Sequence, residues 1–568
     1  MLLAALLACT TATPPTPRAV QADADVHPAL AASSAALAAP QVLNPAPDVH
    51  VALGYALANV VGLRGPSGWV IVDTTEGRTP ATEVLAAFRQ IADLPVAAVI
   101  LTHNHADHVM GGRVFTDAGT DVPVWSHARL PAALDRVVNL VRDATQVRAQ
   151  RMFGTELAEA ERIGAGIGMR LRFDTSDVAL ARPTHTYEGR TTIEAGGLML
   201  ELIHVPGETD DQTAVWWPER GVLLPADDIY RAFPNLYTIR GTPTRDVAGW
   251  IRSLDTLREL HAGVLVPQHT HPLVGADEIA ATLTAYRDAI QYVHDQTVRG
   301  LNAGRTPDEL AATVALPAHL ADHPWLAEHY GRVPWSVRGI YGGYLGWFGG
   351  DASTLEPLPP AERSRRYVAA LAAGRPLPVQ AEEALAAGEH AWAAELAAHA
   401  VRADPEDATA RTLLARAYEG LARGHVNANA VHWYRTAAHE LRGELTLAPT
   451  PPGDAPLELI ESLPLDLFLH GMPPRLRAEE TLDADVLLAF VFPDVDRAFT
   501  LHVRRGIAEL RERPAPADRP PDATVTVPST TFKRLVTRKI GVPEAVTSGG
   551  LEVDGVGALT RVLWWLRP

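Results

Sequence analysis

Hydrophobic residues are spaced in two different ways along the chain. From Gln41 onward, short runs of aliphatic and β-branched residues alternate with longer amphipathic segments, beginning with VHVALGYALANVVGLRGPSGWVIVDT and continuing through the apolar run 96–101. Short apolar runs predict strands, whereas the amphipathic segments between them predict helices. The alternation therefore predicts a mixed α/β sandwich over residues 41–286.

After about Tyr286 the strand-like runs end and alanine-rich segments follow, including EHAWAAELAAHAVRADP, DATARTLLARAYEGLARG and ANAVHWYRTAAHELRG. Their spacing predicts helices and resembles that of tetratricopeptide helix pairs, which bury one face against a neighbouring pair. We therefore expect an all-α domain over residues 287–445.

A proline-rich segment, LTLAPTPPGDAP, separates this region from the end of the chain and predicts a linker. Beyond it, VLLAFVFPDVDRAFTLHV predicts a hairpin with a Pro-Asp turn. The linker and a small α/β domain together account for residues 446–568.

The N-terminal residues 1–40 have a different composition. The sequence LLAALLAC, which ends at the single cysteine Cys9, resembles a bacterial lipoprotein cleavage box, and TTATPPTP after it resembles a flexible tether. We therefore expect export to the periplasm or cell surface, with Cys9 as the site of a lipid anchor. No Lys or Arg precedes the apolar run, so a true start upstream of Met1 stays open.

Composition limits the classes of function. With 47% hydrophobic and 21% charged residues, the chain is typical of a folded globular protein. The net charge of −17 and the lack of any basic run argue against nucleic-acid binding, which needs clustered Lys or Arg. One cysteine excludes an intramolecular disulfide and a cysteine-cluster metal site.

The densest group of potential metal ligands follows the apolar run 96–101. The segment THNHADH contains His103, His105, Asp107 and His108. Neutral imidazole and carboxylate are good zinc ligands, and a loop at the end of a strand can turn such side chains toward one point. The HxHxDH spacing is rare by chance and predicts a metal site.

This motif resembles that of the metallo-β-lactamase superfamily, which implies an αββα sandwich that usually binds two metals. The resemblance also implies a histidine in a later PGH turn, a bridging aspartate and a last histidine. In this sequence the corresponding residues are Glu208 in VPGET, Asp227 in LLPADDIY and His269 in LVPQHTHP. Asp228 and His271 are the alternatives to the last two.

Glutamate in the PGH position resembles the alkylsulfatase branch of the superfamily. The segment NLYTIRG is similar to the sulfate-contacting segment of that branch, with Asn235 and Arg240 as the corresponding residues. VRGIYGGYLGWFGGD and HVNANAVHWYRTAAHELRG resemble its helical dimerisation domain, and the last domain resembles its sterol-carrier-like module. The sequence departs from the branch at Asp227, where glutamate is usual.

The resemblance implies zinc-dependent hydrolysis of alkyl sulfate esters, such as dodecyl sulfate, by a homodimer formed through the helical domain. It implies two Zn²⁺ per chain. The ligands of the first ion are His103, His105 and Glu208, and those of the second are Asp107, His108 and His269. Asp227 lies between the two ions. Two such metals lower the pKa of water and hold nucleophile and ester in line. The bond that breaks and the donor of the leaving-group proton stay open.

Charge explains why an arginine is expected beside the metals. Two zinc ions and the carboxylates of Asp107, Glu208 and Asp227 leave an excess of one positive charge, so a separate cation is expected to hold the sulfate. Arg240 is our candidate because a guanidinium bonds two oxygens of a tetrahedral oxyanion at once, and Arg245 is a weaker one. The catalytic assignments are thus Asp107 and Arg240.

Several alternatives stay open. Substrate-binding assignments are Asn235, Tyr237 and Arg240, although Tyr237 has an equal alternative as a packed aromatic residue. The aromatic residues of the segment 341–348 are expected to pack in the helical domain, with an alkyl channel as the alternative. The other functions considered are a phosphodiesterase, lactonase or lactamase using the same metals, and an amphiphile-binding lipoprotein with a degenerate metal site.

Overall fold

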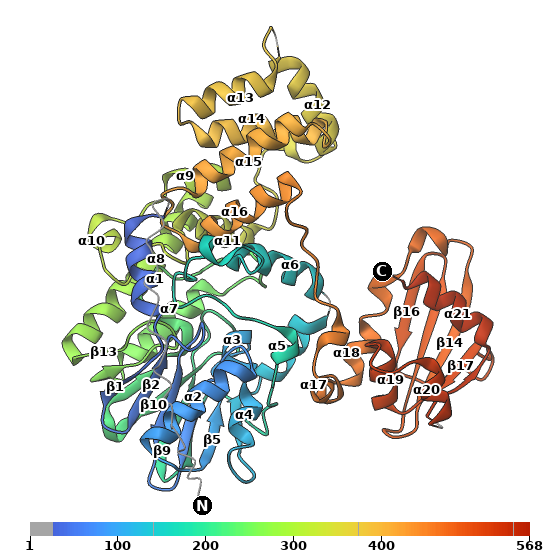
Figure 1. Ribbon diagram of the computed structural model, residues 1–568, viewed down its shortest axis with the longest axis horizontal. Coiled ribbons are helices and arrows are strands. Elements are labelled where there is room, and N and C mark those ends of the chain that lie inside the picture. The colour runs from blue at the N-terminus through green and yellow to red at the C-terminus, as the bar shows by residue number, and fades with distance from the viewer. Residues whose placement is uncertain (1–25, 140, 373, 549, 568) are drawn as a thin grey trace, which may run out of the picture.

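The structure of the protein is a computed structural model that describes residues 26–139, 141–372, 374–548 and 550–567 (Figure 1). Cys9 and the lipoprotein-like segment lie outside these residues, so export and lipid attachment stay predictions. Among the described helices, none combines the length and apolar character needed to cross a membrane.

Two sheets form the centre of the N-terminal domain. The first has seven strands in sequence order, antiparallel from β1 to β4 and parallel from β4 to β7. Its strands are β1 (Gln41–Ala46), β2 (Val49–Leu53), β3 (Val60–Arg64), β4 (Trp69–Val72), β5 (Val96–Ile100), β6 (Val124–His127) and β7 (His185–Tyr187).

The second sheet has six strands in the order β13-β12-β11-β10-β9-β8, and all its neighbours are antiparallel except β11 and β12. Its strands are β8 (Arg190–Ala195), β9 (Leu198–His204), β10 (Thr213–Trp217), β11 (Val222–Leu224), β12 (Val264–Leu265) and β13 (Leu273–Val274).

The sheets pack face to face with helices on both outer faces, which confirms the predicted αββα sandwich (Figure 1). Val72 and Ile100 of the first sheet share one core with Leu202 of the second, while Phe88 and Trp250 pack on the outer faces. The helices and 3₁₀ turns of this region are α2 (Arg78–Ile91), α3 (Ala106–Val109), α4 (Gly112–Thr116), α5 (Leu130–Asn139), α6 (Arg142–Phe153), η1 (Glu159–Glu161), η2 (Thr175–Asp177), η3 (Pro218–Arg220), η4 (Ala226–Asp228), α7 (Val247–Arg258) and α8 (Ala276–Asn302).

The helical region follows α8 and confirms the all-α domain expected there. Its elements are α9 (Pro307–Thr313), α10 (Ala318–Ala321), α11 (Val333–Leu345), η5 (Ala352–Thr354), α12 (Pro360–Leu371), α13 (Leu377–Ala386), α14 (His390–Ala403), α15 (Ala408–Ala422) and α16 (Ala428–Arg442). Each of the helices α13 to α16 packs against the next one along the chain, as expected of helix repeats (Figure 1).

Two segments differ from the sequence-based division into domains. The boundary expected after residue 286 falls inside the continuous helix α8, because Tyr286, Ile290 and Val293 all pack into the core on the second sheet. Residues 28–37, expected in a flexible tether, form α1 (Pro28–Leu37) instead, because Leu30 is buried against side chains that include Val431 of α16.

The C-terminal domain is a separate α/β unit joined by the proline-rich segment (Figure 1). The hairpin predicted around Pro493 is present, with Phe492 paired to Arg497 across the turn. The elements are η6 (Pro452–Asp454), α17 (Leu457–Ser462), α18 (Leu465–His470), η7 (Pro473–Arg475), η8 (Ala478–Glu480), β14 (Asp485–Phe492), β15 (Arg497–Arg504), β16 (Ile507–Arg511), β17 (Ala523–Thr526), α19 (Ser529–Val536), α20 (Val542–Thr547), β18 (Glu552–Asp554) and α21 (Val556–Trp565). Its likeness to sterol-carrier proteins stays a prediction.

The aromatic cluster at the end of α11 does not pack as one unit. Tyr341 is buried in the core beside α8, as expected, but Tyr344 and Trp347 are 57% and 77% exposed. The expectation of core packing is therefore wrong for these two residues in the single chain, because they lie at and beyond the last turn of α11. Tyr344 contacts His294 of α8 through its hydroxyl at 2.8 Å but stays largely exposed.

Candidate metal centre

The HxHxDH segment leaves the C-terminal end of β5 and enters the short helix α3, which brings its four side chains to one end of the sandwich. His103 and His108 are fully buried, and Asp107 is partly buried. The buried strand fixes where the segment begins, and α3 turns Asp107 and His108 back toward His103. The local arrangement expected from the spacing is thus present.

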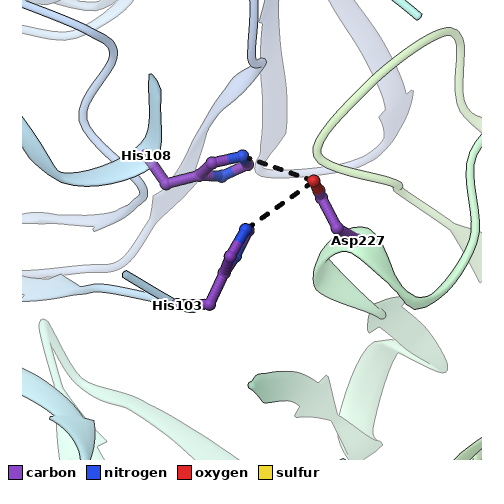
Figure 2. Close-up of side chains that lie close together, drawn as sticks. All are labelled: His103, His108 and Asp227. Carbon is purple, nitrogen blue, oxygen red and sulfur yellow. Dashed lines mark ion pairs between the residues drawn. The ribbon is translucent and has the colours of Figure 1, made fainter. Parts of the chain in front are cut away.

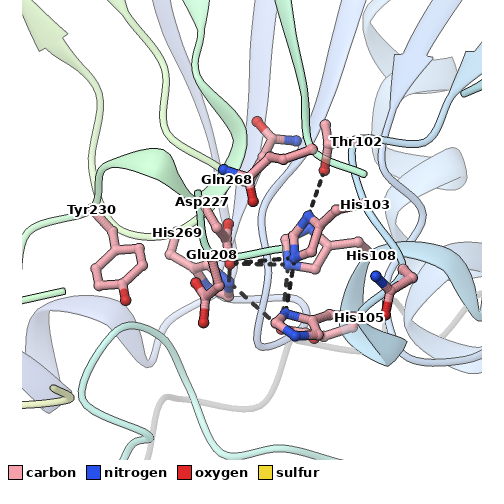
Figure 3. Close-up of polar contacts among 12 residues, drawn as sticks. Thr102, His103, His105, His108, Glu208, Asp227, Tyr230, Gln268 and His269 are labelled. Atoms are coloured by element: carbon pink, nitrogen blue, oxygen red, sulfur yellow. Dashed lines mark hydrogen bonds and ion pairs between the residues drawn. The ribbon is translucent and has the colours of Figure 1, made fainter. Parts of the chain in front are cut away.

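Three later loops bring Glu208, Asp227 and His269 to the same place (Figure 3). These loops follow β9, β11 and β12, and all three side chains are buried. Each strand ends at the edge of the sandwich reached by β5, so residues far apart in sequence meet there.

Asp227 occupies the centre of the group. Its Oδ2 lies 3.7 Å from His103 Nε2 and 3.5 Å from His108 Nε2 (Figure 2). The same oxygen lies 3.2 Å from His269 Nε2. Asp107 Oδ2 lies 3.6 Å from both His108 Nε2 and His269 Nε2. A carboxylate oxygen thus faces several ring nitrogens, as expected of ligands around a shared cation.

Neither sequence alternative joins the group. Asp228 turns away and accepts a hydrogen bond from Gln212 Nε2 at 2.5 Å, while its backbone oxygen accepts one from Trp250 Nε1. His271 instead lines a cavity of about 300 Å³ beside α1. The structure therefore brings Asp227 and His269 into the cluster and leaves Asp228 and His271 outside it.

The seven side chains form three overlapping groups that fit a metal ion. One group contains Asp107, His108 and His269, which matches the expected second zinc site. The other groups are His105, Glu208 and Asp227, and His103, His108 and Asp227. Since Asp227 belongs to two groups, it lies where a bridging ligand is expected.

Hydrogen bonds on the outer side of the rings turn the inner nitrogens toward the centre. His108 Nδ1 lies 2.7 Å from Asp73 Oδ2, His103 Nδ1 3.0 Å from Thr102 Oγ1, and His269 Nδ1 3.1 Å from the Leu57 carbonyl. Partners of this kind hold the proton on Nδ1 and leave the Nε2 lone pair available for a cation. Asp73 also accepts from Gln268 Nε2 at 2.9 Å, which fixes the carboxylate.

Some inner polar atoms pair with one another, as His103 Nε2 does with His105 Nδ1 at 2.9 Å, but three have no hydrogen-bond partner among the described residues. Among the described residues, His108 Nε2, Glu208 Oε2 and Asp227 Oδ1 are buried without a hydrogen bond. Burial raises the pKa of Glu208, although the positive charge of Arg245 opposes this shift. For Asp227, burial is outweighed by His269 and the other histidine rings, which hold its pKa well below its usual range. Because buried polar atoms need partners, this donor set fits divalent cations of the zinc type.

The predicted sulfate-binding segment lies beside the cluster. Arg240 Nη2 is 3.1 Å from His105 Nε2, and Arg240 Nη1 donates to Thr238 Oγ1 at 3.0 Å. Asn235 is buried, and neither atom of its side-chain amide has a hydrogen-bond partner among the described residues. Tyr237 lies against Gly339 of α11, which matches the alternative of a packed aromatic residue.

Sequence reasoning underrated Arg245, which lies closer to the carboxylates than Arg240. Its Nη1 is 2.8 Å from Glu208 Oε1, and both side chains are buried. The same nitrogen donates to the Asn235 backbone carbonyl. The sequence around Arg245 contains no motif that predicts this ion pair, because the two residues are 37 positions apart (245 − 208) and meet only in the folded chain.

Sequence reasoning also missed a tyrosine cluster. Tyr230 packs edge-on to His269, with ring centres 6.1 Å apart, and its hydroxyl accepts from Asn235 N at 2.9 Å. Tyr330, from the region before α11, packs against Tyr230 with ring centres 5.8 Å apart. Burial and Glu208 raise the pKa of Tyr330, so its hydroxyl keeps its proton. Tyr330 lies beyond the catalytic domain expected at residues 41–286. The spacing of residues around the metal ligands therefore could not predict that Tyr330 contributes to the site.

The four-layer sandwich and its cluster of histidines and carboxylates define a metallo-β-lactamase-type metal centre. A metallo-beta-lactamase superfamily model matches residues 53–269, an alkyl sulfatase dimerisation model matches 306–444, and an alkyl sulfatase C-terminal model matches 454–566.

Similarity to known proteins places the chain in one branch of the metallo-β-lactamase superfamily. A linear primary-alkylsulfatase from a Pseudomonas species is 37% identical over 521 residues, which cover 87% of this chain and 95% of the relative. An (R)-specific secondary-alkylsulfatase from Pseudomonas sp. is 29% identical, covering 90% of this chain and 78% of the relative. The solved structure of a stereoselective inverting sec-alkylsulfatase from Pseudomonas sp. has a TM-score of 0.87 at 27% identity, covering 96% of this chain and 87% of that one. The chain belongs to the alkylsulfatase family.

Proposed function

We propose that this protein hydrolyses alkyl sulfate esters to an alcohol and inorganic sulfate, with two zinc ions held by the seven clustered side chains. The observation that carries the proposal is the placement of Glu208, Asp227 and Arg240 around one buried centre. Membership of the alkylsulfatase family supports the substrate class.

Different residues of the site would hold the metal ions, bind the sulfate group and form the wall of the site. When bound, zinc supplies Lewis acidity and lowers the pKa of water. His103, His108 and His269 present Nε2 toward the centre, held there by outer hydrogen bonds. Arg240 and the free amide of Asn235 are placed to bind and orient the sulfate oxygens. The tyrosine cluster packs against His269 and walls one side of the site.

The test of this function is sulfate release from zinc-loaded protein. Dodecyl sulfate should yield inorganic sulfate, a strong chelator should stop the release, and added zinc should restore it. Decyl, octyl and secondary alkyl sulfates belong in the same panel. If no alkyl sulfate yields sulfate while a phosphodiester, lactone or β-lactam is hydrolysed, the proposal fails in favour of another hydrolase. If zinc does not bind at all, an amphiphile-binding role replaces both.

Arg240→Ala should retain the zinc content of the natural protein and lose roughly 10²-fold or more in turnover of sulfate esters, because the guanidinium that orients the anion is removed. Zinc per chain and steady-state kinetics with dodecyl sulfate measure the two effects. Arg231→Ala, an exposed arginine nearby in sequence, is the matched control. Unchanged kinetics in Arg240→Ala would place the sulfate anchor elsewhere.

We also propose that the full chain forms a homodimer through its helical region. The match to the dimerisation model over 306–444 supports this, as do Tyr344 and Trp347, which a single chain leaves exposed. Light scattering should give twice the 61.0 kDa chain mass. Replacing both aromatic residues by serine should shift the protein toward monomer, and a monomeric natural protein would contradict the proposal.

A further inference from the structure

The buried ion pair between Glu208 and Arg245 changes the charge of the metal centre. Their side chains are 1% and 2% exposed, and the Glu208 Oε1 to Arg245 Nη1 distance is 2.8 Å. Arg245 makes no other ion pair among the described residues. Burial in a low-dielectric interior strengthens the interaction, because water does not screen it.

The two oxygens of Glu208 have different surroundings. Oε1 faces Arg245, whereas Oε2 is buried without a hydrogen-bond partner among the described residues. Glu208 as a residue belongs to the group with His105 and Asp227. One oxygen is therefore available to a cation while the other is neutralised by a fixed guanidinium. Among the described residues, no arginine pairs with Asp227, whose close neighbours are histidine rings.

Backbone contacts hold the guanidinium in this position. Arg245 Nη1 also donates to the Asn235 carbonyl, and Asn235 N donates to the Tyr230 hydroxyl at 2.9 Å. Asp246, the next residue, caps α7 by accepting from Gly249 N at 2.9 Å. Arg245 is thus fixed between a helix start and the sulfate-binding segment.

We propose that Arg245 is a positioning and charge-setting residue for Glu208, so that the Glu208–Arg245 pair acts as an electrically neutral ligand equivalent to an imidazole. This inference rests on the proposed zinc-dependent cleavage of sulfate esters. With two divalent cations, Asp107, Asp227 and the neutral pair leave a net charge of two rather than one. The positive potential needed to bind an anionic substrate is thereby kept although a carboxylate replaces histidine.

A double-variant cycle tests this charge balance. Arg245→Met lowers the net charge by one, Glu208→His raises it by one, and the double variant restores it. Arg245→Met should bind inorganic sulfate about tenfold more weakly without losing zinc affinity, and Glu208→His should bind sulfate more tightly and zinc more weakly. The double variant should return both affinities to within about threefold of the natural protein.

Both affinities are measured without turnover, by calorimetric titration of inorganic sulfate into zinc-loaded protein and by competition for zinc with a chelating dye. A failure of the cycle is therefore distinguishable from a lack of sulfatase activity. Opposite changes in the two affinities are not expected from a merely structural defect, which would weaken both. Arg245→Lys keeps the charge and should retain the sulfate affinity even if Arg245→Met folds poorly.

Arg252→Met is the matched control, since Arg252 lies on α7 with a 70% exposed side chain and pairs with Asp246. It should change neither affinity. The proposal is overturned if Arg245→Met leaves sulfate affinity unchanged, if it weakens zinc and sulfate together, or if the double variant is worse than both single variants for both ligands.

Discussion

Replacing Asp227 by asparagine should remove most bound zinc and lower sulfate-ester hydrolysis by about 10³-fold, the loss expected when several kcal/mol of metal-centred stabilisation disappear. Its Oδ2 is within 3.7 Å of three histidine Nε2 atoms, and Asp227 belongs to two of the three candidate metal groups. A neutral amide keeps the shape but removes the charge that balances two cations. Metal analysis of the purified variant and sulfate-release kinetics measure the two losses.

The adjacent aspartate provides the control. Asp228→Asn makes the same change one residue away, on a side chain that turns from the cluster and contacts Gln212. Burial, followed by Asp227 and Glu208, raises the pKa of Asp228 well above its usual range. Asp228→Asn should therefore keep its zinc. The reverse pattern, with zinc lost in Asp228→Asn alone, would show that the other aspartate is the ligand.

Glu208→Ala should lose one zinc per chain, most of its activity and roughly 3–5 kcal/mol of stability. The stability loss is expected because Arg245 keeps its buried charge without a partner. Zinc per chain, sulfate release and urea unfolding of the zinc-free protein separate these effects.

Glu219→Ala changes an exposed glutamate in the same part of the chain and should be neutral in all three measurements. Glu208→Ala protein with full zinc content and full activity would exclude Glu208 as a ligand. Loss of stability in the zinc-free protein together with intact zinc content would limit Glu208 to its ion pair with Arg245.

The parts of the site that the sequence predicted are those with local patterns. His103, His105, Asp107 and His108 follow one strand within a single short segment, so their spacing alone placed them together. Glu208, Asp227 and His269 were placed by family resemblance, each after a strand-like run, and the structure brings all seven side chains to one centre. The charge count, by contrast, omitted Arg245, because a pair across a tertiary contact has no local pattern.

The fold shows the same limit. Periodicity predicted a mixed α/β sandwich, the helical region and the last hairpin, because the strands and helices of each depend on neighbouring residues. The αββα arrangement of the two sheets was implied by family resemblance. Periodicity did not predict that α8 continues past residue 286 or that residues 28–37 form a helix. Both depend on what a helix packs against, such as the hydrophobic cluster that Leu30 shares with Val431, which only the three-dimensional arrangement supplies.

The uninterrupted helix α8 joins the hydrolytic half of the chain to the helical half without a linker. The same 27-residue rod covers the second sheet at one end and leads into α9 at the other. Tyr330, which walls the metal centre, comes from beyond that rod. The helical half, which matches the dimerisation model, therefore also supplies a residue to the surroundings of the metal centre.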